Sequence, residues 1–390
     1  MENCVSSSLF SPQNSLIDQW ILCARACFDI PIDIEQYLRN SLSHKIPPLF
    51  MQWAKNFEND LFEARYGYSS GLPQLEPYTE ICIETLLQEK GVLQHCRPLI
   101  SQHTLCITHD IDHLELSPKL MLKRIISERK MTSFKQNKRS FLPSIRTLLE
   151  LSASLSTSSK SVATIFAASP IFSKNPFYWP MQWIMDPSYT VNHPQFLEFK
   201  ALIKEFQCDV GLHGSFYSLS QNFLEREKEV LEVAMGHEIN LLRQHWLHLP
   251  GRKAWSVIKK SKFQIDSTLG WNGTIGFRGG MARPFEILVD KESQSTIWEV
   301  PLLLMDGPLF CDLNFSPKKI EKLTKELLKK VIQRNGCVAI NWHDRSADPF
   351  YQWDGLFKEI LTFSALNNFQ FLTLKEAVQV CFEKRFFSAN

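Results

Sequence analysis

The feature that most constrains the fold is an alternation of apolar, strand-like runs with helical runs from about residue 101 to residue 380. Strand-like runs include TLCITHD, CDVGLHGS, INLLRQHWLHLP and CVAINWHD, and YWPMQWIMD (178–186) is predicted to be another buried strand. Between them lie amphipathic segments such as FLEREKEVLEVAM and KKIEKLTKELLKKVIQRNG, the latter stopped by Gly336. Such alternation predicts an α/β fold with parallel strands.

The N-terminal part of the chain has a different pattern. SLIDQWILCARACF and YTEICIETLLQEKGVL carry apolar residues at helical spacing. We therefore predict a mostly helical region of unknown role over residues 1–98 and the α/β domain over residues 99–390. A stretch rich in Lys, Arg and Ser at about 118–160 is interpreted as a solvated helical insertion, and its charge also permits contact with an anionic lipid or polysaccharide.

Composition excludes several classes of protein. The formal net charge of +2 gives no reason to expect nucleic acid as a partner. The 10 Cys are irregularly spaced and form no CxxC pair, which argues against a zinc-finger or disulfide framework. No apolar run reaches roughly 18 residues, so no stable membrane insertion is expected. The N-terminus lacks a basic segment followed by an apolar one, and the expected location is cytoplasmic.

Polar residues cluster where the predicted strands end. Six of them occupy this position: Asp110, Asp112, His213, Arg243, Asp266 and His343. In a (β/α) barrel the carboxyl ends of the strands form the catalytic face. Independent ion pairs in the core would have no reason to favour that end, so we expect these side chains to form one site.

The stretch THDIDH supplies the first part of this site. Residues two apart on a strand point to the same side, so Asp110 and Asp112 face one site while His109 and Ile111 face away. Two carboxylates that close repel each other unless a cation or a shared proton relieves them. A divalent metal held by one carboxylate, with the other free as a base, satisfies this requirement, and the alternative is a pair of surface carboxylates on a loop.

Two histidines at strand ends extend the pattern. His213 lies in a Gly-flanked turn, which suits a neutral imidazole metal ligand. His343 ends a buried strand and could be a second ligand or a general acid. Together with the carboxylates, these residues indicate metal-dependent chemistry.

The order of these motifs resembles that of the polysaccharide deacetylase family, carbohydrate esterase family 4, in a divergent bacterial branch that carries THDxDH. The resemblance covers about residues 101–380 and implies a distorted (β/α)7-type barrel. It implies that Asp110 is the general base, that Asp112 and His213 bind the metal, and that Arg243 of RQHWLHLP holds the base. His343 of INWH would be the general acid.

The same resemblance implies further roles. Asp266 of DSTLGW would hold the imidazolium form of His343. Four residues are expected to contact substrate: Trp271, Arg278, Ile340 and Trp342. The implied cofactor is a divalent ion, zinc above all, and the implied partner is an N-acetylated sugar or glycan.

One position departs from the family pattern. The second metal histidine of the family falls on Tyr217, and tyrosine is a poor zinc ligand near neutral pH. Tyr217 itself, His113 and His245 are therefore candidates for the remaining ligand, and the favoured interpretation of each of these two histidines is a structural or ligand-orienting role.

The function expected from the sequence is a metal-dependent hydrolase that removes N-acetyl or O-acetyl groups from a sugar or glycan precursor. A carbohydrate-binding barrel with impaired catalysis is the alternative that Tyr217 keeps open. A glycosyltransferase using Asp110 and Asp112 as a DxD motif is the second alternative, but it leaves His213 and His343 without roles. The sequence does not determine the oligomeric state.

Overall fold

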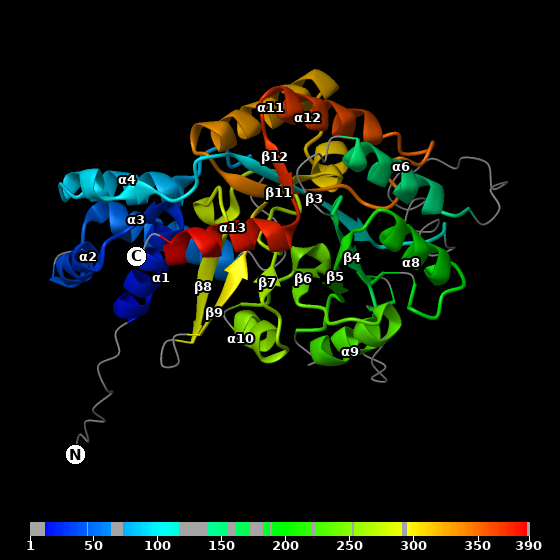
Figure 1. Cartoon of the computed structure of the whole chain (residues 1–390), viewed down its shortest axis with the longest axis horizontal. Coiled ribbons are helices and arrows are strands. Elements are labelled where there is room, and N and C mark those ends of the chain that lie inside the picture. Colours follow the sequence, from blue (N-terminus) through cyan, green and yellow to red (C-terminus); the bar gives the residue numbers. More distant parts are fainter. Residues whose placement is uncertain are drawn as a thin grey trace, which may run out of the picture.

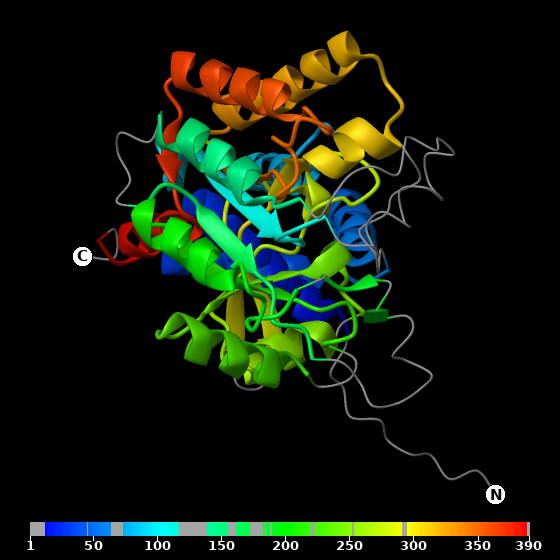
Figure 2. The same cartoon turned by 90° about the vertical axis from the view of Figure 1, so that its right-hand side faces the viewer.

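A computed structural model describes most of the chain. The described residues are 12–44, 46–63, 73–116, 139–154, 161–171, 182–183, 185–187, 189–219, 223–251, 253–290 and 295–387. The predicted α/β class is confirmed, because a curved, mainly parallel sheet forms the centre and helices surround it (Figures 1 and 2).

The strands of this sheet follow one another around a distorted barrel. Their order is β10 (Leu302–Met305), β11 (Cys337–Asn341), β3 (Thr104–Ile111), β4 (Thr164–Ala167), β5 (Asp209–Gly214), β6 (Leu241–Gln244), β7 (Ile265–Asp266), β9 (Ser295–Glu299) and β8 (Phe285–Asp290). β12 (Gln370–Leu372) also pairs with β3. Because β9 pairs with β7, β10 pairs with β11, and only Val300 and Pro301 separate β9 from β10, the path returns toward its start. This arrangement is the predicted (β/α)7-type barrel.

Helices cover the outside of the barrel. They are α6 (Leu142–Ala153), α8 (Phe196–Glu205), α9 (Leu224–Met235), α10 (Lys253–Lys260), α11 (Pro317–Gln333), α12 (Asp354–Leu366) and α13 (Leu374–Phe387). α11 begins where the Ser316 side chain accepts a hydrogen bond from the Lys319 amide, and it buries one apolar stripe that includes Leu327, Leu328 and Val331. In the part of the chain that the structure describes, no helix has the length and apolar character needed to cross a bilayer.

An N-terminal helical layer lies against one side of the barrel (Figure 1). It contains α1 (Pro12–Cys27), α2 (Ile32–His44), α3 (Pro48–Glu58) and α4 (Tyr78–Glu89). The Gln19 amide donates to the Glu286 carbonyl at 2.8 Å and accepts from the Leu288 amide at 2.8 Å. The Gln19 side chain thereby makes the two hydrogen bonds with β8 that the backbone of a neighbouring strand would make. It satisfies backbone groups at the edge of the sheet.

Two details of the sequence prediction differ from the structure. The run 178–186 is predicted to be a strand, but three of its described residues, Gln182, Trp183 and Met185, are helical, and β4 lies earlier in the chain. A short apolar run cannot be assigned to strand or helix by periodicity alone, and Pro180 disfavours an inner strand. Most of the predicted insertion at 118–160 lies outside the described residues, apart from the segment that contains α6.

Candidate metal-binding active site

A cavity of about 250 Å³ opens at the carboxyl ends of the strands. Its lining residues are Asp110, Asp112, His213, Gln244, His245, Trp246, Leu247, Asn272, Met305, Gly307, Cys311, Asp312, His343 and Arg345. Of the six polar residues predicted at strand ends, Asp110, Asp112, His213 and His343 line the cavity, whereas Arg243 and Asp266 lie behind its wall. Parallel strands bring these residues together because their carboxyl ends share one edge.

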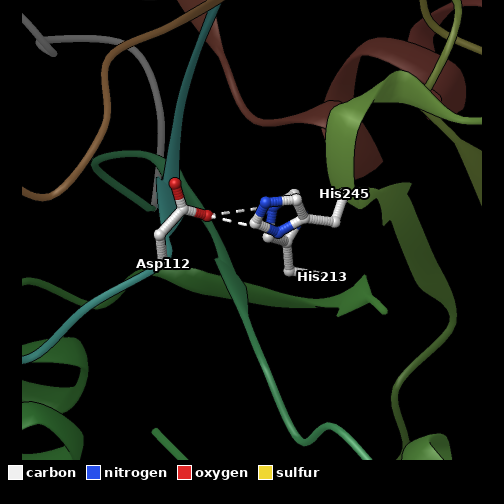
Figure 3. A group of neighbouring side chains, drawn as sticks. All are labelled: Asp112, His213 and His245. Carbon is white, nitrogen blue, oxygen red and sulfur yellow. Dashed lines mark ion pairs between the residues drawn. The ribbon is translucent and has the colours of Figure 1, made fainter. Parts of the chain in front are cut away.

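Three side chains in this cavity converge as metal ligands would. One ligand atom from each of Asp112, His213 and His245 lies within 4.8 Å of the other two, and we call these three residues the metal-ligand group. Asp112 Oδ1 is 3.3 Å from His213 Nε2 and 3.5 Å from His245 Nδ1 (Figure 3). All three residues are buried, and they come from the ends of β3, β5 and β6.

The hydrogen bonding of His213 makes this convergence informative. Its Nδ1 is 3.0 Å from the Arg243 carbonyl, which can only accept, so Nδ1 carries the proton. In neutral His213 the Nε2 lone pair then faces Asp112 Oδ1, and among the described residues that oxygen accepts no hydrogen bond. Facing lone pairs are unfavourable unless a proton or a cation lies between them. A carbonyl that orients an imidazole in this way is typical of a metal-binding histidine, so these residues fit a divalent metal.

Arg345 holds the other oxygen of Asp112. Its guanidinium lies 3.0 Å from Asp112 Oδ2. Burial raises the pKa of Asp112, but the contact with His213 and the charges of His343, His245 and Arg345 hold it well below its ordinary value. Asp112 is therefore an ionised carboxylate with one oxygen fixed by Arg345 and the other directed at the two histidines.

Asp110 is fixed by a buried arginine. Arg243 Nη1 donates to Asp110 Oδ1 at 2.9 Å and to Thr108 Oγ1 at 2.7 Å. Arg243 is fully buried, and its guanidinium stacks on the Phe166 ring at 4.4 Å from the centroid. This contact keeps a positive charge beside Asp110, as the predicted arginine clamp requires.

His343 is held by Asp306, which is not among the site residues predicted from the sequence. Its Nδ1 donates to Asp306 Oδ1 at 2.5 Å, and its backbone amide donates to Asp306 Oδ2 at 2.9 Å. Burial lowers the pKa of His343, but the Asp306 charge and hydrogen bond raise it to about 9. His343 is thus an imidazolium at neutral pH, with Nε2 3.9 Å from Asp112 Oδ2.

Asp266, which was expected to hold His343, has other neighbours in the structure. It accepts a hydrogen bond from Thr268 at 2.6 Å, and its second oxygen is buried beside Glu299. Burial raises the pKa of Asp266 to about 6 and that of Glu299 well above its ordinary value, to which the Asp266 charge contributes. Two buried carboxyls that interact in this way titrate as a pair and can share one proton.

This carboxyl pair predicts a pH-dependent stability. The pKa values of both carboxyls are raised in the folded state. The stability that the pair contributes is therefore complete at a pH below the pKa values of the unfolded chain, and it is lost as the pH rises through the pKa values of the folded protein. Glu299→Gln keeps a donor toward Asp266 without needing the proton. We expect its free energy of unfolding, measured by urea denaturation, to fall less than that of the wild type between pH 5 and pH 8. An equally steep fall in both proteins would contradict a shared proton.

The four predicted substrate contacts do not line the cavity. Ile340 and Trp342 are fully buried on the outer side of β11, where the Trp342 ring stacks on Phe357 at 5.1 Å. Arg278 is fully buried, lies over the Trp271 ring at 5.4 Å and donates to the Asp60 and Gly270 carbonyls. Because these four side chains are buried and do not reach the cavity, they contribute to packing.

The candidates for the third ligand can also be placed. His245 lies in the metal-ligand group, whereas Tyr217 does not line the cavity, and its ring contacts Phe216. The His113 ring is outside the group, although its backbone amide donates to Asp344 Oδ2 at 3.0 Å. A signal for Asp306 was present in the sequence, because it follows the strand-like run PLLLM as the other site residues follow theirs.

Comparisons with known proteins give similarity of fold only. No family model matches the sequence, and no curated protein matches it. Among solved structures, the chain is similar to a putative polysaccharide deacetylase from Mycobacterium smegmatis, with 16% identity over 74% of this chain and 96% of that one and a TM-score of 0.47. A peptidoglycan deacetylase from Bacillus subtilis matches with 12% identity over 74% and 96% of the two chains and a TM-score of 0.34. A CE4-family pseudoenzyme from Bacillus anthracis matches with 10% identity over 71% and 66% and a TM-score of 0.32. These structural neighbours are therefore polysaccharide deacetylases and their pseudoenzymes, and similarity at this level carries no conclusion about activity.

Proposed function

We propose that this protein is a metal-dependent hydrolase that removes an acetyl group from an N-acetylated or O-acetylated sugar. One observation carries the proposal: a clamped carboxylate, a three-residue metal-ligand group and a histidine hydrogen-bonded to Asp306 all line one cavity. Asp110, Asp112 and His343 have distinct partners there, so each is set up for a different task.

The chain would divide the reaction between two proton carriers. A divalent metal such as zinc, held by Asp112, His213 and His245, would supply Lewis-acid polarisation of the acetyl carbonyl and acidify water. Asp110 takes the proton of the attacking water as general base. His343 gives its proton to the departing amine or hydroxyl, so that the acetyl C–N or C–O bond breaks with a neutral leaving group.

These roles need opposite protonation states in one cavity, and the neighbours of each residue supply them. The Arg243 guanidinium places a positive charge 2.9 Å from the Asp110 carboxylate. Asp306 favours the charged form of His343 and fixes its proton on Nδ1, leaving Nε2–H toward the cavity. An acid and a base separated by environment in this way are typical of hydrolytic sites.

An aromatic rim beside the cavity supports a carbohydrate substrate. Phe310 is 37% exposed and lies next to Cys311 and Asp312, which line the cavity. Its ring stacks on Trp353 with centroids 4.9 Å apart. Phe350, 38% exposed, is connected to this pair through the Tyr351 ring, which contacts both Phe350 and Trp353. Exposed aromatic rings at the mouth of a polar cavity offer apolar faces on which sugar rings can stack.

The glycosyltransferase alternative has less support. In a DxD site both carboxylates serve a metal-bound nucleotide diphosphate, but Asp110 is paired with Arg243 and is not part of the metal-ligand group. His343 and Asp306 would have no task in such an enzyme. We therefore retain hydrolysis as the proposed reaction.

The decisive experiment removes and restores the metal. We expect protein stripped with a chelator and reloaded with Zn²⁺ to release acetate from N-acetylglucosamine, its oligomers or acetylated nucleotide sugars, and the stripped protein to release none. Asp112→Ala serves as the control that cannot be reloaded. Saccharide binding with zinc but without acetate release would instead support the impaired carbohydrate-binding barrel. Glycosyl transfer from a nucleotide sugar would support the transferase.

A further inference from the structure

The N-terminal helical layer makes an extended contact with the loop that follows β7. Gln74 and Gly276 form a β-bridge, in which the Gln74 amide donates to the Ile275 carbonyl at 3.0 Å and the Phe277 amide donates to the Gln74 carbonyl at 2.9 Å. Asp60 Oδ2 accepts from the Gly279 amide at 2.8 Å. This loop is therefore packed against the N-terminal layer.

Arg278 connects this anchor to the wall of the active site. Its Nε donates to the Asp60 carbonyl at 2.8 Å, and its Nη1 donates to the Gly270 carbonyl at 3.0 Å. The guanidinium also lies over the Trp271 ring. One fully buried side chain thus links the N-terminal layer to residues 270–271, which precede a cavity-lining residue, Asn272.

Asn272 in turn contacts the turn that carries a metal ligand. Its Nδ2 donates to the Trp246 carbonyl at 3.3 Å, and Trp246 directly follows His245. Trp246 and Leu247 have φ values of 59° and 49°, in the left-handed region that side chains other than glycine rarely adopt. Such a turn persists only where its neighbours hold it, and Asn272 is one of the groups that do so.

We propose that Asp60, Arg278 and Asn272 are positioning residues that hold His245 in the metal site, so that the N-terminal layer is part of the machinery of the site. The inference rests on the proposed metal site. It goes beyond it by giving the N-terminal region a task and by assigning Arg278 to support rather than to substrate contact. None of the three residues need touch the substrate for this role.

Metal affinity, measured by isothermal titration of the stripped full-length chain with Zn²⁺, provides the test. We expect Asn272→Ala and Asp60→Ala each to weaken zinc binding by about fivefold to tenfold, the scale of one lost hydrogen bond. Because both residues act through the same turn, we expect the zinc affinity of the double variant to be about that of the single variant with the lower affinity. Multiplicative losses in the double variant would show two independent effects and overturn the proposal.

A matched control separates positioning from general loss of stability. Glu80 and Arg283 form a buried ion pair between the N-terminal layer and the barrel, at 2.9 Å, but neither lines the cavity. Glu80→Gln should lower the melting temperature and leave zinc affinity unchanged. Equal weakening of zinc binding by Glu80→Gln, or unchanged affinity in Asn272→Ala, would overturn the inference.

The remaining outcomes are also decisive. If Asp60→Ala does not fold, Tyr78→Phe replaces it, because the Tyr78 hydroxyl is the second donor to Asp60 Oδ2, at 2.8 Å. Wild-type protein that binds zinc but releases no acetate would contradict the proposed hydrolysis and leave this inference to be judged on affinity alone. Wild-type protein that does not bind zinc would overturn both.

Discussion

Replacing His245 by alanine is expected to weaken zinc binding by more than about a hundredfold, whereas Tyr217→Phe should leave it unchanged. Loss of a residue that merely orients a ligand already costs about 10- to 100-fold in metal affinity, so loss of a ligand should cost more. His245 Nδ1 lies 3.5 Å from Asp112 Oδ1 in the metal-ligand group, but Tyr217 does not line the cavity. Isothermal titration with Zn²⁺ and metal analysis after gel filtration would measure the difference.

Two controls bracket this result. Asp112→Ala should abolish zinc binding, because it removes the negative charge as well as a ligand. His113→Ala should bind zinc as the wild type does, because its ring lies outside the group. If Tyr217→Phe lost zinc and His245→Ala retained it, the ligand set drawn from the structure would be incorrect.

The strand-end residues could be predicted because two local rules are enough to place them. The carboxyl ends of parallel strands share an edge, and residues two apart on a strand share a face. Asp110 faces the cavity, while His109 faces outward and lies 5.7 Å from the Phe357 ring. The same alternation places Ile340 and Trp342 on the outer face of β11, so their predicted substrate roles conflicted with a rule already applied to β3.

Other features depend on contacts that no local pattern encodes. His245 reaches Asp112 because of a turn with left-handed residues, and nothing in RQHWLHLP specifies that turn. Asp306 rather than Asp266 meets His343 because β10 is the direct neighbour of β11, whereas β7 pairs with β6 and β9. Strand order in a closed sheet is a long-range property, so sequence reasoning found the correct residue type at the wrong strand end.

Asp110→Asn is the second large effect that we expect: zinc binding is retained while turnover falls by about 10²- to 10⁴-fold, the usual contribution of a general base. The amide has nearly the same shape and can still accept from Arg243 through its oxygen, but it cannot take a proton from water. Asp110 is not among the grouped ligand atoms, so its loss should not release the metal. Steady-state acetate release and zinc titration on the same preparation would separate the two quantities.

The comparison with Asp112→Asn makes this prediction specific to each residue. Both variants remove one carboxylate charge from the same cavity. If each aspartate contributed only its charge, the two variants would lose zinc affinity and turnover to the same extent. In the proposed site they differ, because Asp112→Asn should lose zinc and turnover together, whereas Asp110→Asn should lose turnover alone. Full activity in zinc-loaded Asp110→Asn would remove Asp110 as the base, and Arg243 would then be holding a structural carboxylate.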